Sequence, residues 1–353
     1  MALPASGAMR MGANVDVELS LASTTAISLG STSVRGLYGV ASGAIRLAAD
    51  GYGKANLPSF APFVGGMSAG NTIGYSNNDK YTFSNDSTAV GTVYPISAGG
   101  TVAAAGNTTT AIFRVNGTSA SRRFYTYSTD SWATGTALST TASSMGSISN
   151  KTVAIDQNAS AATTQKYTYS SSVESTGGSL TYNPGYGGSS CIGNSTVGIF
   201  CGGGVTGPYN ALKTSSIYTY STDTTATGGN LVIATYSGGA FWAAGIGIST
   251  IGYFCGGVDQ FTVSGINSTS SYTYSTNATA AGFSLNYPIC YSGGGGSPTT
   301  GINIGGATNI QSYGAYTANS TKYTYSSTTV SSGGSLSQAK YYLAGPGATP
   351  AAI

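Results

Sequence analysis

The chain has 353 residues, of which only 7% are charged, and its formal net charge is +3. No basic cluster beyond Arg122–Arg123 occurs, so the electrostatic footprint of a nucleic-acid-binding protein is missing. No stretch approaches the roughly 20 apolar residues that span a bilayer, and the start lacks the apolar core of a secretion signal. We therefore expect neither nucleic-acid binding nor membrane insertion.

The first 55 residues differ in composition from the rest of the chain. They hold seven of the 23 charged residues (13 basic and 10 acidic), namely Arg10, Asp16, Glu18, Arg35, Arg46, Asp50 and Lys54. Their short apolar stretches, VDVELSLA and AIRLAA, are too small to form a core alone and need a partner surface. We predict that residues 1–55 are an attachment and oligomerisation segment and that residues 56–353 form a separate domain.

Three short motifs lie toward the end of this segment. They are Ser-Val-Arg-Gly-Leu at residues 33–37, Ser-Gly-Ala-Ile at 42–45 and Tyr-Gly-Lys at 52–54. This text resembles a short N-terminal segment found in many bacteriophage virion proteins, where it precedes a variable distal domain. The resemblance implies that residues 1–55 dock to other virion proteins.

From Tyr81 onward the chain consists of repeats. The tetrapeptide Tyr-Thr-(Tyr/Phe)-Ser begins at six anchors spaced 44, 42, 51, 54 and 51 residues apart: Tyr81, Tyr125, Tyr167, Tyr218, Tyr272 and Tyr323. Ten residues after each anchor stands a glycine, and in the last five copies a leucine follows three residues later. Aromatic and β-branched residues favour strands, while the polar residues and glycine favour turns, so each anchor is predicted to be one strand of a hairpin.

A second element precedes the anchor in four copies. This element has four residues: a phenylalanine or asparagine, then an apolar residue, then Gly-Gly. It occurs at residues 63–66, 200–203, 254–257 and 303–306. A period near 50 with about four short strands is typical of a propeller blade. The Gly-Gly pairs, the tyrosines and, in one copy, Trp132 resemble kelch repeats, and Lys-Tyr-Thr-Tyr-Ser at Lys166 and Lys322 is similar to propeller repeats of phage structural genes. We predict an all-β fold, a six-bladed kelch-like β-propeller preceded by the short attachment segment.

The two ends of the repeat region complement each other. The strand at Phe63 has no repeat strand before it, and the chain stops at Ile353 just before another Gly-Gly strand would be due. Pairing between the ends would remove exposed sheet edges. We predict that residues 336–353 supply a strand to the blade that contains Phe63–Ser84.

The side chains available for catalysis are few. Histidine is absent, which removes Ser-His-Asp and Cys-His bases and histidine metal sites. Glycoside hydrolysis needs only two carboxylates, but three of the acidic residues occupy one turn slot five residues after an anchor: Asp86, Asp130 and Asp223. That leaves Asp79, Asp156, Glu174 and Asp259 in the propeller. We expect no enzymatic activity, no cofactor and no metal site.

The four cysteines lack the spacing of metal ligands. Cys201 and Cys255 align with Val64 and are predicted to be core residues, whereas a disulfide between Cys191 and Cys290 remains open. Two blades lack the Gly-Gly strand and carry Arg114 and Asp156 in equivalent strands, where we predict an ion pair, with separate exposure to water as the alternative.

Tyrosines outside the repeat are the candidates for a binding face, because tyrosine anchors interfaces and aromatic faces stack on sugar rings. They are Tyr186, Tyr209, Tyr236, Tyr291 and Tyr313. The hypothesis that follows is a non-enzymatic phage virion protein, a tail fibre or similar appendage, present in several copies on the particle surface and recognising a host-surface glycan. The alternative is a free carbohydrate-binding lectin or adhesin.

Overall fold

The computed structural model describes residues 58–67, 74–95, 102–115, 122–135, 146–158, 161–185, 190–204, 212–232, 242–259, 262, 264–309 and 315–347. The predicted attachment segment, residues 1–55, lies outside these ranges. Every regular element in the described ranges is a strand, and these ranges hold no helix long and apolar enough to cross a membrane.

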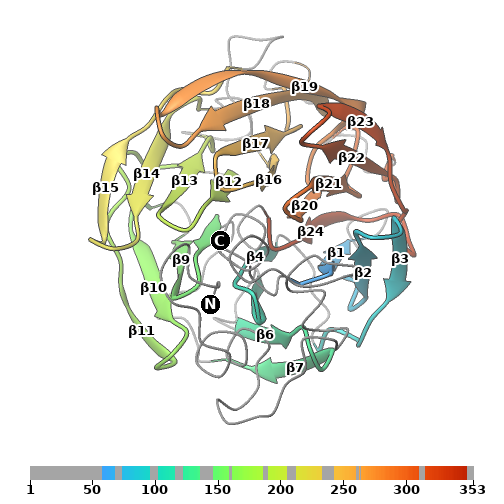
Figure 1. Ribbon diagram of the computed structural model, residues 1–353, viewed down its shortest axis with the longest axis horizontal. Coiled ribbons are helices and arrows are strands. Elements are labelled where there is room, and N and C mark those ends of the chain that lie inside the picture. Colours follow the sequence, from blue (N-terminus) through green and yellow to red (C-terminus); the bar gives the residue numbers. More distant parts are fainter. Residues whose placement is uncertain are drawn as a thin grey trace, which may run out of the picture. The chain divides into compact units, whose positions relative to one another are not determined.

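The described strands form six antiparallel four-stranded sheets around a common centre (Figure 1). From the centre outward, blade 1 contains β24 (Tyr341–Ala344), β1 (Phe60–Met67), β2 (Asn78–Thr82) and β3 (Ser87–Val90). Blade 2 contains β4 (Val102–Gly106), β5 (Thr110–Val115), β6 (Arg122–Thr126) and β7 (Ser131–Thr134). Blade 3 contains β8 (Ser147–Ser149), β9 (Val153–Gln157), β10 (Thr164–Thr168) and β11 (Val173–Thr176).

The remaining blades follow the same order. Blade 4 contains β12 (Ser190–Gly193), β13 (Val197–Cys201), β14 (Ser215–Thr219) and β15 (Thr224–Thr227). Blade 5 contains β16 (Ala244–Gly247), β17 (Ile251–Cys255), β18 (Ile266–Thr273) and β19 (Ala278–Ile289). Blade 6 contains β20 (Gly293–Gly296), β21 (Thr300–Ile304), β22 (Ser320–Thr324) and β23 (Thr329–Ser332). The predicted six-bladed propeller is confirmed.

Blade 1 is assembled from both ends of the repeat region. Strand β24 pairs antiparallel with β1, with Ala344 opposite Val64 and Tyr341 opposite Met67. The predicted closure is therefore confirmed. Because the last strand completes the first sheet, β1 is paired on both sides, and blade 1 has four strands like the other five blades.

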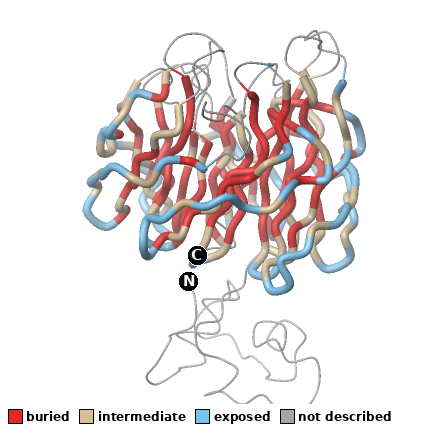
Figure 2. Tube along the Cα trace, turned by 90° about the horizontal axis from the view of Figure 1, so that it is seen from above, coloured by how far each residue is buried: buried red, intermediate tan, exposed pale blue. Residues whose placement is uncertain are grey.

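The blades pack on one another through the middles of their strands, which are buried while the hairpins are exposed (Figure 2). At most interfaces a phenylalanine from one blade meets an aliphatic or cysteine side chain of the preceding blade, as Phe113 meets Val64 and Phe254 meets Cys201. Cys201 and Cys255 are fully buried, as predicted, and all four cysteines are free. Burial of these side chains supplies the hydrophobic stabilisation of the ring.

The outer hairpins show why one slot of the repeat favours Asp. The residue five positions after each anchor has a left-handed φ of 47–57°, which Asp and Asn adopt more readily than most residues: Asp86, Asp130, Ser172, Asp223, Asn277 and Thr328. In blades 1, 2, 4 and 5 the anchor hydroxyl donates a hydrogen bond to this residue, as Tyr81 does to Asp86 at 2.7 Å. The interpretation of the aspartates as turn residues is confirmed.

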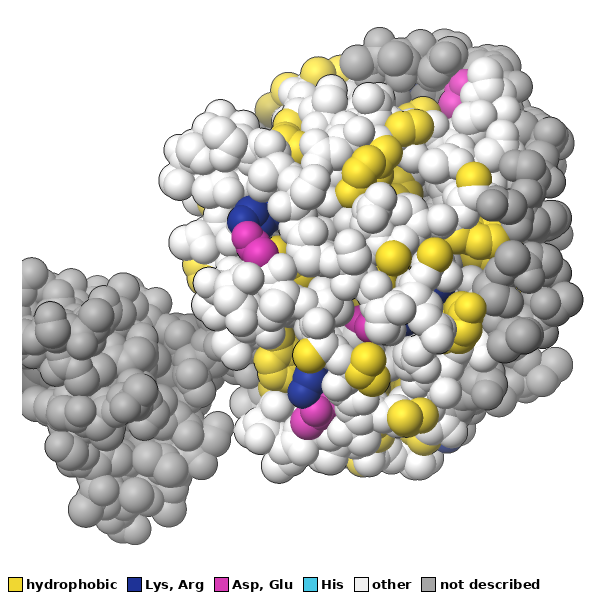
Figure 3. Space-filling model, turned by 90° about the vertical axis from the view of Figure 1, so that its right-hand side faces the viewer, with side chains coloured by type: hydrophobic (Ala, Val, Ile, Leu, Met, Phe, Trp, Pro, Cys, Tyr) yellow, Lys and Arg dark blue, Asp and Glu magenta, His cyan; other side chains and the backbone are white. Residues whose placement is uncertain are grey.

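The same aspartates accept hydrogen bonds from lysines of the preceding blade. The ion pairs are Lys80–Asp130, Lys166–Asp223 and Lys322–Asp86, the last of which joins blade 6 to blade 1. Figure 3 shows neighbouring basic and acidic side chains of this kind on a face that is otherwise mostly uncharged. Three of the six interfaces between blades therefore carry a half-exposed lysine–aspartate pair on the outer side.

Candidate functional site

The innermost strands of all six blades surround a cavity of about 100 Å³ on the axis of the ring. Every blade contributes to the lining. In order from blade 1, representative lining residues are Leu343, Ala103, Ser147, Ser190, Ala244 and Gly294. The described side chains that line the cavity are uncharged and mostly small. The cavity is therefore a neutral pocket whose polar groups are hydroxyls and backbone amides.

Glycines allow the innermost strands of neighbouring blades to touch backbone to backbone. A Cβ on Gly245 would lie 1.9 Å from the carbonyl oxygen of Cys191, one on Gly294 would lie 2.2 Å from that of Gly245, and one on Gly345 would lie 2.3 Å from that of Gly294. No side chain fits at such distances. These close approaches narrow the channel of the propeller to a small pocket.

Three serines line this pocket. The Ser147 hydroxyl donates to Asp156 at 2.5 Å, and the Ser190 hydroxyl accepts the Ala243 N–H at 3.0 Å. The hydroxyl of Ser292 is buried and has no hydrogen-bond partner among the described residues, although only 8% of Ser292 is exposed. A buried hydroxyl without a hydrogen-bond partner lowers the stability of the folded chain.

Three aromatic residues are the sequence neighbours of residues that line the pocket. Trp242, Tyr291 and Tyr342 directly precede lining residues of blades 5, 6 and 1, and each stands two positions before an equivalent residue of its innermost strand. Their φ angles are 53°, 56° and 58°, a region in which bulky non-glycine residues are rare. Strained backbone of this kind is concentrated at functional sites. We call these three residues the aromatic arc.

The aromatic arc is a continuous packed unit. The ring centroids of Trp242 and Tyr291 are 4.2 Å apart, and those of Tyr291 and Tyr342 are 3.9 Å apart. Their backbones are linked as well, because Tyr291 N–H donates to Trp242 O and Tyr342 N–H donates to Tyr291 O. Tyr291 is buried in the centre, while Trp242 and Tyr342 are half-buried. The arc thus consists of one buried and two half-buried aromatic residues.

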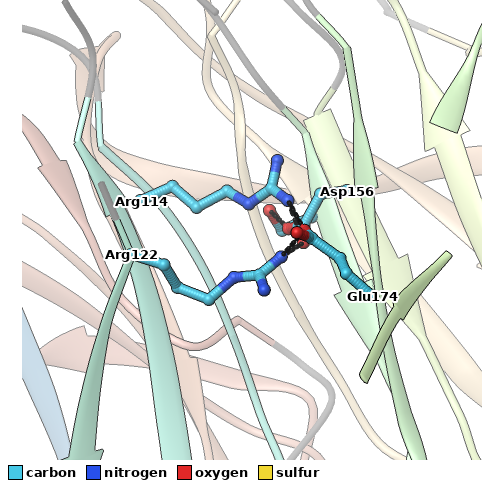
Figure 4. Close-up of polar contacts among 5 residues, drawn as sticks. Arg114, Arg122, Asp156 and Glu174 are labelled. Atoms are coloured by element: carbon cyan, nitrogen blue, oxygen red, sulfur yellow. Dashed lines mark hydrogen bonds and ion pairs between the residues drawn. The ribbon is translucent and has the colours of Figure 1, made fainter. Parts of the chain in front are cut away.

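A buried charge cluster lies between blades 2 and 3, behind the serine side of the pocket (Figure 4). Arg114 Nη2 is 2.7 Å from Asp156 Oδ2, which confirms the predicted ion pair, and both side chains are 1% exposed. Arg122 contacts the same carboxylate at 3.3 Å and Glu174 at 2.7 Å. Burial lowers the pKa of Arg114 to about 10, against the opposing effect of Asp156. The two positive and two negative charges balance within the cluster.

The remaining carboxylates of interest are also engaged. Asp79 pairs with Lys340 at 2.7 Å, with both side chains fully buried, and Asp259 accepts a hydrogen bond from Thr262 at 2.6 Å. Burial raises the pKa of the Cys191 thiol well above its ordinary value, so this thiol beside the pocket is a poor nucleophile. Among the described residues no three His, Cys, Asp or Glu side chains are grouped to hold a metal ion.

The predicted binding tyrosines divide into two groups. Tyr291 lies in the aromatic arc, whereas Tyr186, Tyr209, Tyr236 and Tyr313 lie outside the described residues. Sequence reasoning missed Trp242, Tyr342 and Ser292. The available signal was alignment of the innermost strands, which places Trp242, Tyr291 and Tyr342 at one repeat position.

Comparison with known proteins gives the fold and no family. No family model matches the chain, and no curated protein matches it in sequence. Among solved structures the chain is similar to YjhT, with a TM-score of 0.55 and 12% sequence identity over 69% of this chain and 86% of that one. This likeness supports the propeller architecture, which is compatible with a binding role.

Proposed function

We propose that this chain is a non-enzymatic component of a bacteriophage virion, a tail fibre or comparable appendage. Residues 1–55 attach it to other virion proteins, and the propeller faces outward to recognise a glycan on the host surface. The virion assignment is supported by the motifs at residues 33–54, and the recognition role by the architecture of the pocket.

The observation that carries the binding role is the neutral axial pocket, which residues of all six blades line. Aromatic and apolar surface with a few placed polar groups is the usual composition of a ligand site. Acid–base chemistry finds little support there, because Asp156, which accepts a hydrogen bond from the lining residue Ser147, is also held by two arginines. The second candidate, a free lectin, uses the same pocket and differs in not needing residues 1–55.

The test uses the full chain and a chain shortened to begin at Asn56. The propeller occupies Ser59–Ile353 as a unit of its own, so the shortened chain is expected to fold and to bind host cells. The shortened chain is also expected to be missing from purified virus particles. Mass spectrometry of the particles is expected to detect the full chain. If the full chain is absent from the particles but binds host cells, the result favours the free lectin. Glycan cleavage by the purified protein would overturn the non-enzymatic proposal.

A further inference from the structure

The pairing of β24 with β1 differs from the other pairings of an innermost strand. In blades 2–6 the innermost strand joins the second strand through a hairpin of three residues, at residues 107–109, 150–152, 194–196, 248–250 and 297–299. In blade 1, β1 ends at Met67 and β24 begins at Tyr341, so the two strands come from opposite ends of the repeat region (Figure 1). A hairpin fixes the register of its two strands. The register of β24 on β1 must therefore be fixed by other contacts.

The connection that leads into β24 makes a contact that recurs around the ring. In three other connections a backbone N–H donates to the hydroxyl two positions before the next anchor: Thr181 to Ser216 at 3.1 Å, Val232 to Ser270 at 2.8 Å and Asn286 to Thr321 at 3.3 Å. At the junction of blade 6 with blade 1, Ser337 N–H donates to Asp79 Oδ1 at 3.0 Å. A carboxylate thus takes the place of a hydroxyl at the closing junction.

A buried lysine accompanies this carboxylate. Lys340 directly precedes β24, its Nζ lies 2.7 Å from Asp79 Oδ2, and both side chains are 0% exposed. Its counterpart in the connection from blade 5 to blade 6 is Ile289, because the carbonyl of Lys340 accepts Gly306 N–H just as that of Ile289 accepts Gly257 N–H. The closing junction therefore carries a buried ion pair where the preceding junction carries an isoleucine and a threonine.

The pair depends on the position of β24. Moving β24 by one residue shifts it by about 3.3 Å and turns its side chains to the other face, and moving it by two residues doubles the displacement. Either shift takes Lys340 away from Asp79. Burial already lowers the pKa of Lys340, against the opposing effect of Asp79. A buried charge that loses its partner disfavours the shifted arrangement roughly 150- to 5,000-fold.

The pair also depends on the blade that receives β24. The positions equivalent to Asp79 in blades 2–6 hold no acidic residue; they are Arg123, Gln165, Ser216, Ser270 and Thr321. On any of these blades Lys340 would be buried without a counter-charge, and on blade 2 it would face an arginine. Lys340 therefore finds its partner on blade 1.

We propose that the buried Lys340–Asp79 pair selects blade 1 and sets the register in which the C-terminal strand closes the ring. Desolvation offsets the attraction between the two charges, so the pair adds little net stability. It acts by making every other docking of β24 unfavourable.

The test compares the full chain with the full-length variant Lys340→Ile, Asp79→Thr, which carries at the closing junction the residues of the preceding junction. Register is read by disulfide formation from Val64→Cys, because Val64 lies opposite Ala344 and a shift of two residues would bring Tyr342 or Pro346 to that place. Val64→Cys is combined in turn with Ala344→Cys, Tyr342→Cys or Pro346→Cys, and mass spectrometry of the linked peptides quantifies each pair. With the native pair we expect linkage at position 344. In the double variant, linkage at 342 or 346 should rise at least about tenfold.

The control uses the outer ion pair of the same junction. Lys322–Asp86 also joins blade 6 to blade 1, but its side chains are 22% and 36% exposed. Lys322→Met, Asp86→Asn should keep the linkage at position 344. Its matched partner is a second variant of the buried pair, Lys340→Met, Asp79→Asn, which retains the size of both side chains and should give the same shifted linkage as Lys340→Ile, Asp79→Thr.

Thermal unfolding of the variants without added cysteines separates register from stability, and we expect both variants of the buried pair to fold. Linkage at position 344 alone in a variant of the buried pair that folds overturns the proposal. An equal rise of shifted linkage in the outer control overturns it as well. If neither variant of the buried pair folds, the proposal is also wrong, because the pair is then required for stability and not for register.

Discussion

The charge cluster between blades 2 and 3 gives a quantitative prediction for Asp156→Asn. Asp156 stands where blades 1, 2, 4 and 5 carry phenylalanine, and its partner Arg114 stands where blade 1 carries Val64. Arg114 and Arg122 are 1% and 0% exposed. Removing the carboxylate charge leaves two buried guanidinium groups with only Glu174 to compensate them. We expect a loss of about 3–5 kcal/mol in the free energy of unfolding.

Urea unfolding followed by circular dichroism measures this loss, with the slope m unchanged if the transition remains the same. Glu174→Gln is the comparison, because Glu174 is 18% exposed and its loss should cost less. The double variant Arg114→Val, Asp156→Phe restores the kind of contact found between Phe113 and Val64. It should be more stable than Asp156→Asn by about 1–3 kcal/mol. A loss below about 1 kcal/mol for Asp156→Asn, or a double variant that is less stable still, would refute the reasoning.

Three other predictions concern the ring itself. Gly294→Ala should lower stability by about 1–3 kcal/mol or more in urea unfolding, because the new Cβ would lie 2.2 Å from Gly245 O. Burial opposes ionisation of Asp130, but hydrogen bonds from Lys80 and neighbouring groups outweigh it and lower its pKa from 3.8 to about 2. The contribution of ionised Asp130 to the free energy of unfolding is thus present above about pH 4 and lost as the pH falls toward 2. In Lys80→Met the free energy of unfolding should therefore depend less on pH in that window. Deleting residues 341–353 removes β24 and should produce aggregated protein on size-exclusion chromatography, whereas deleting 348–353 should leave the elution volume unchanged.

The ring could be predicted from the sequence because its determinants repeat. The anchor tyrosines, the fixed glycines and the turn slot at Asp86 recur in register, so six copies overrule the weak local signal of any single strand. Closure followed from the missing strand before Phe63. The pair Arg114–Asp156 was predictable for a different reason, since two charged residues replace apolar ones in adjacent repeats and a buried charge requires a partner.

The lysine–aspartate pairs also correspond to a pattern in the sequence, from which they could have been predicted. Wherever a blade has lysine just before the anchor, the next blade has aspartate in the turn slot, as with Lys80 and Asp130. Where it has another residue, as at Phe124, the next slot holds a neutral residue, here Ser172. This correlation between neighbouring repeats specifies which blades are adjacent, including blade 6 beside blade 1.

The pocket was not predictable in the same way, because its residues depend on convergence of strands from six repeats. Trp242, Tyr291 and Tyr342 come together only when the innermost strands of blades 5, 6 and 1 meet at the axis. Tyr291 and Tyr342 each follow their anchors, Tyr272 and Tyr323, by 19 residues, whereas Trp242 follows Tyr218 by 24, so the tetrapeptide anchors align only two of the three. Their left-handed φ angles depend on packing that no local pattern encodes.

The positions that break the repeat are the ones that distinguish one side of the ring from the other. Repeated residues give every blade the same interface, and a ring built from them alone would have six equivalent sides and no preferred site. The chain departs from this symmetry with charges between blades 2 and 3 and with the aromatic arc on blades 5, 6 and 1. The charge cluster reaches the axial pocket through Ser147, which lines the pocket and donates a hydrogen bond to Asp156. This contact fixes one polar group of the lining, which the repeated residues alone would not do.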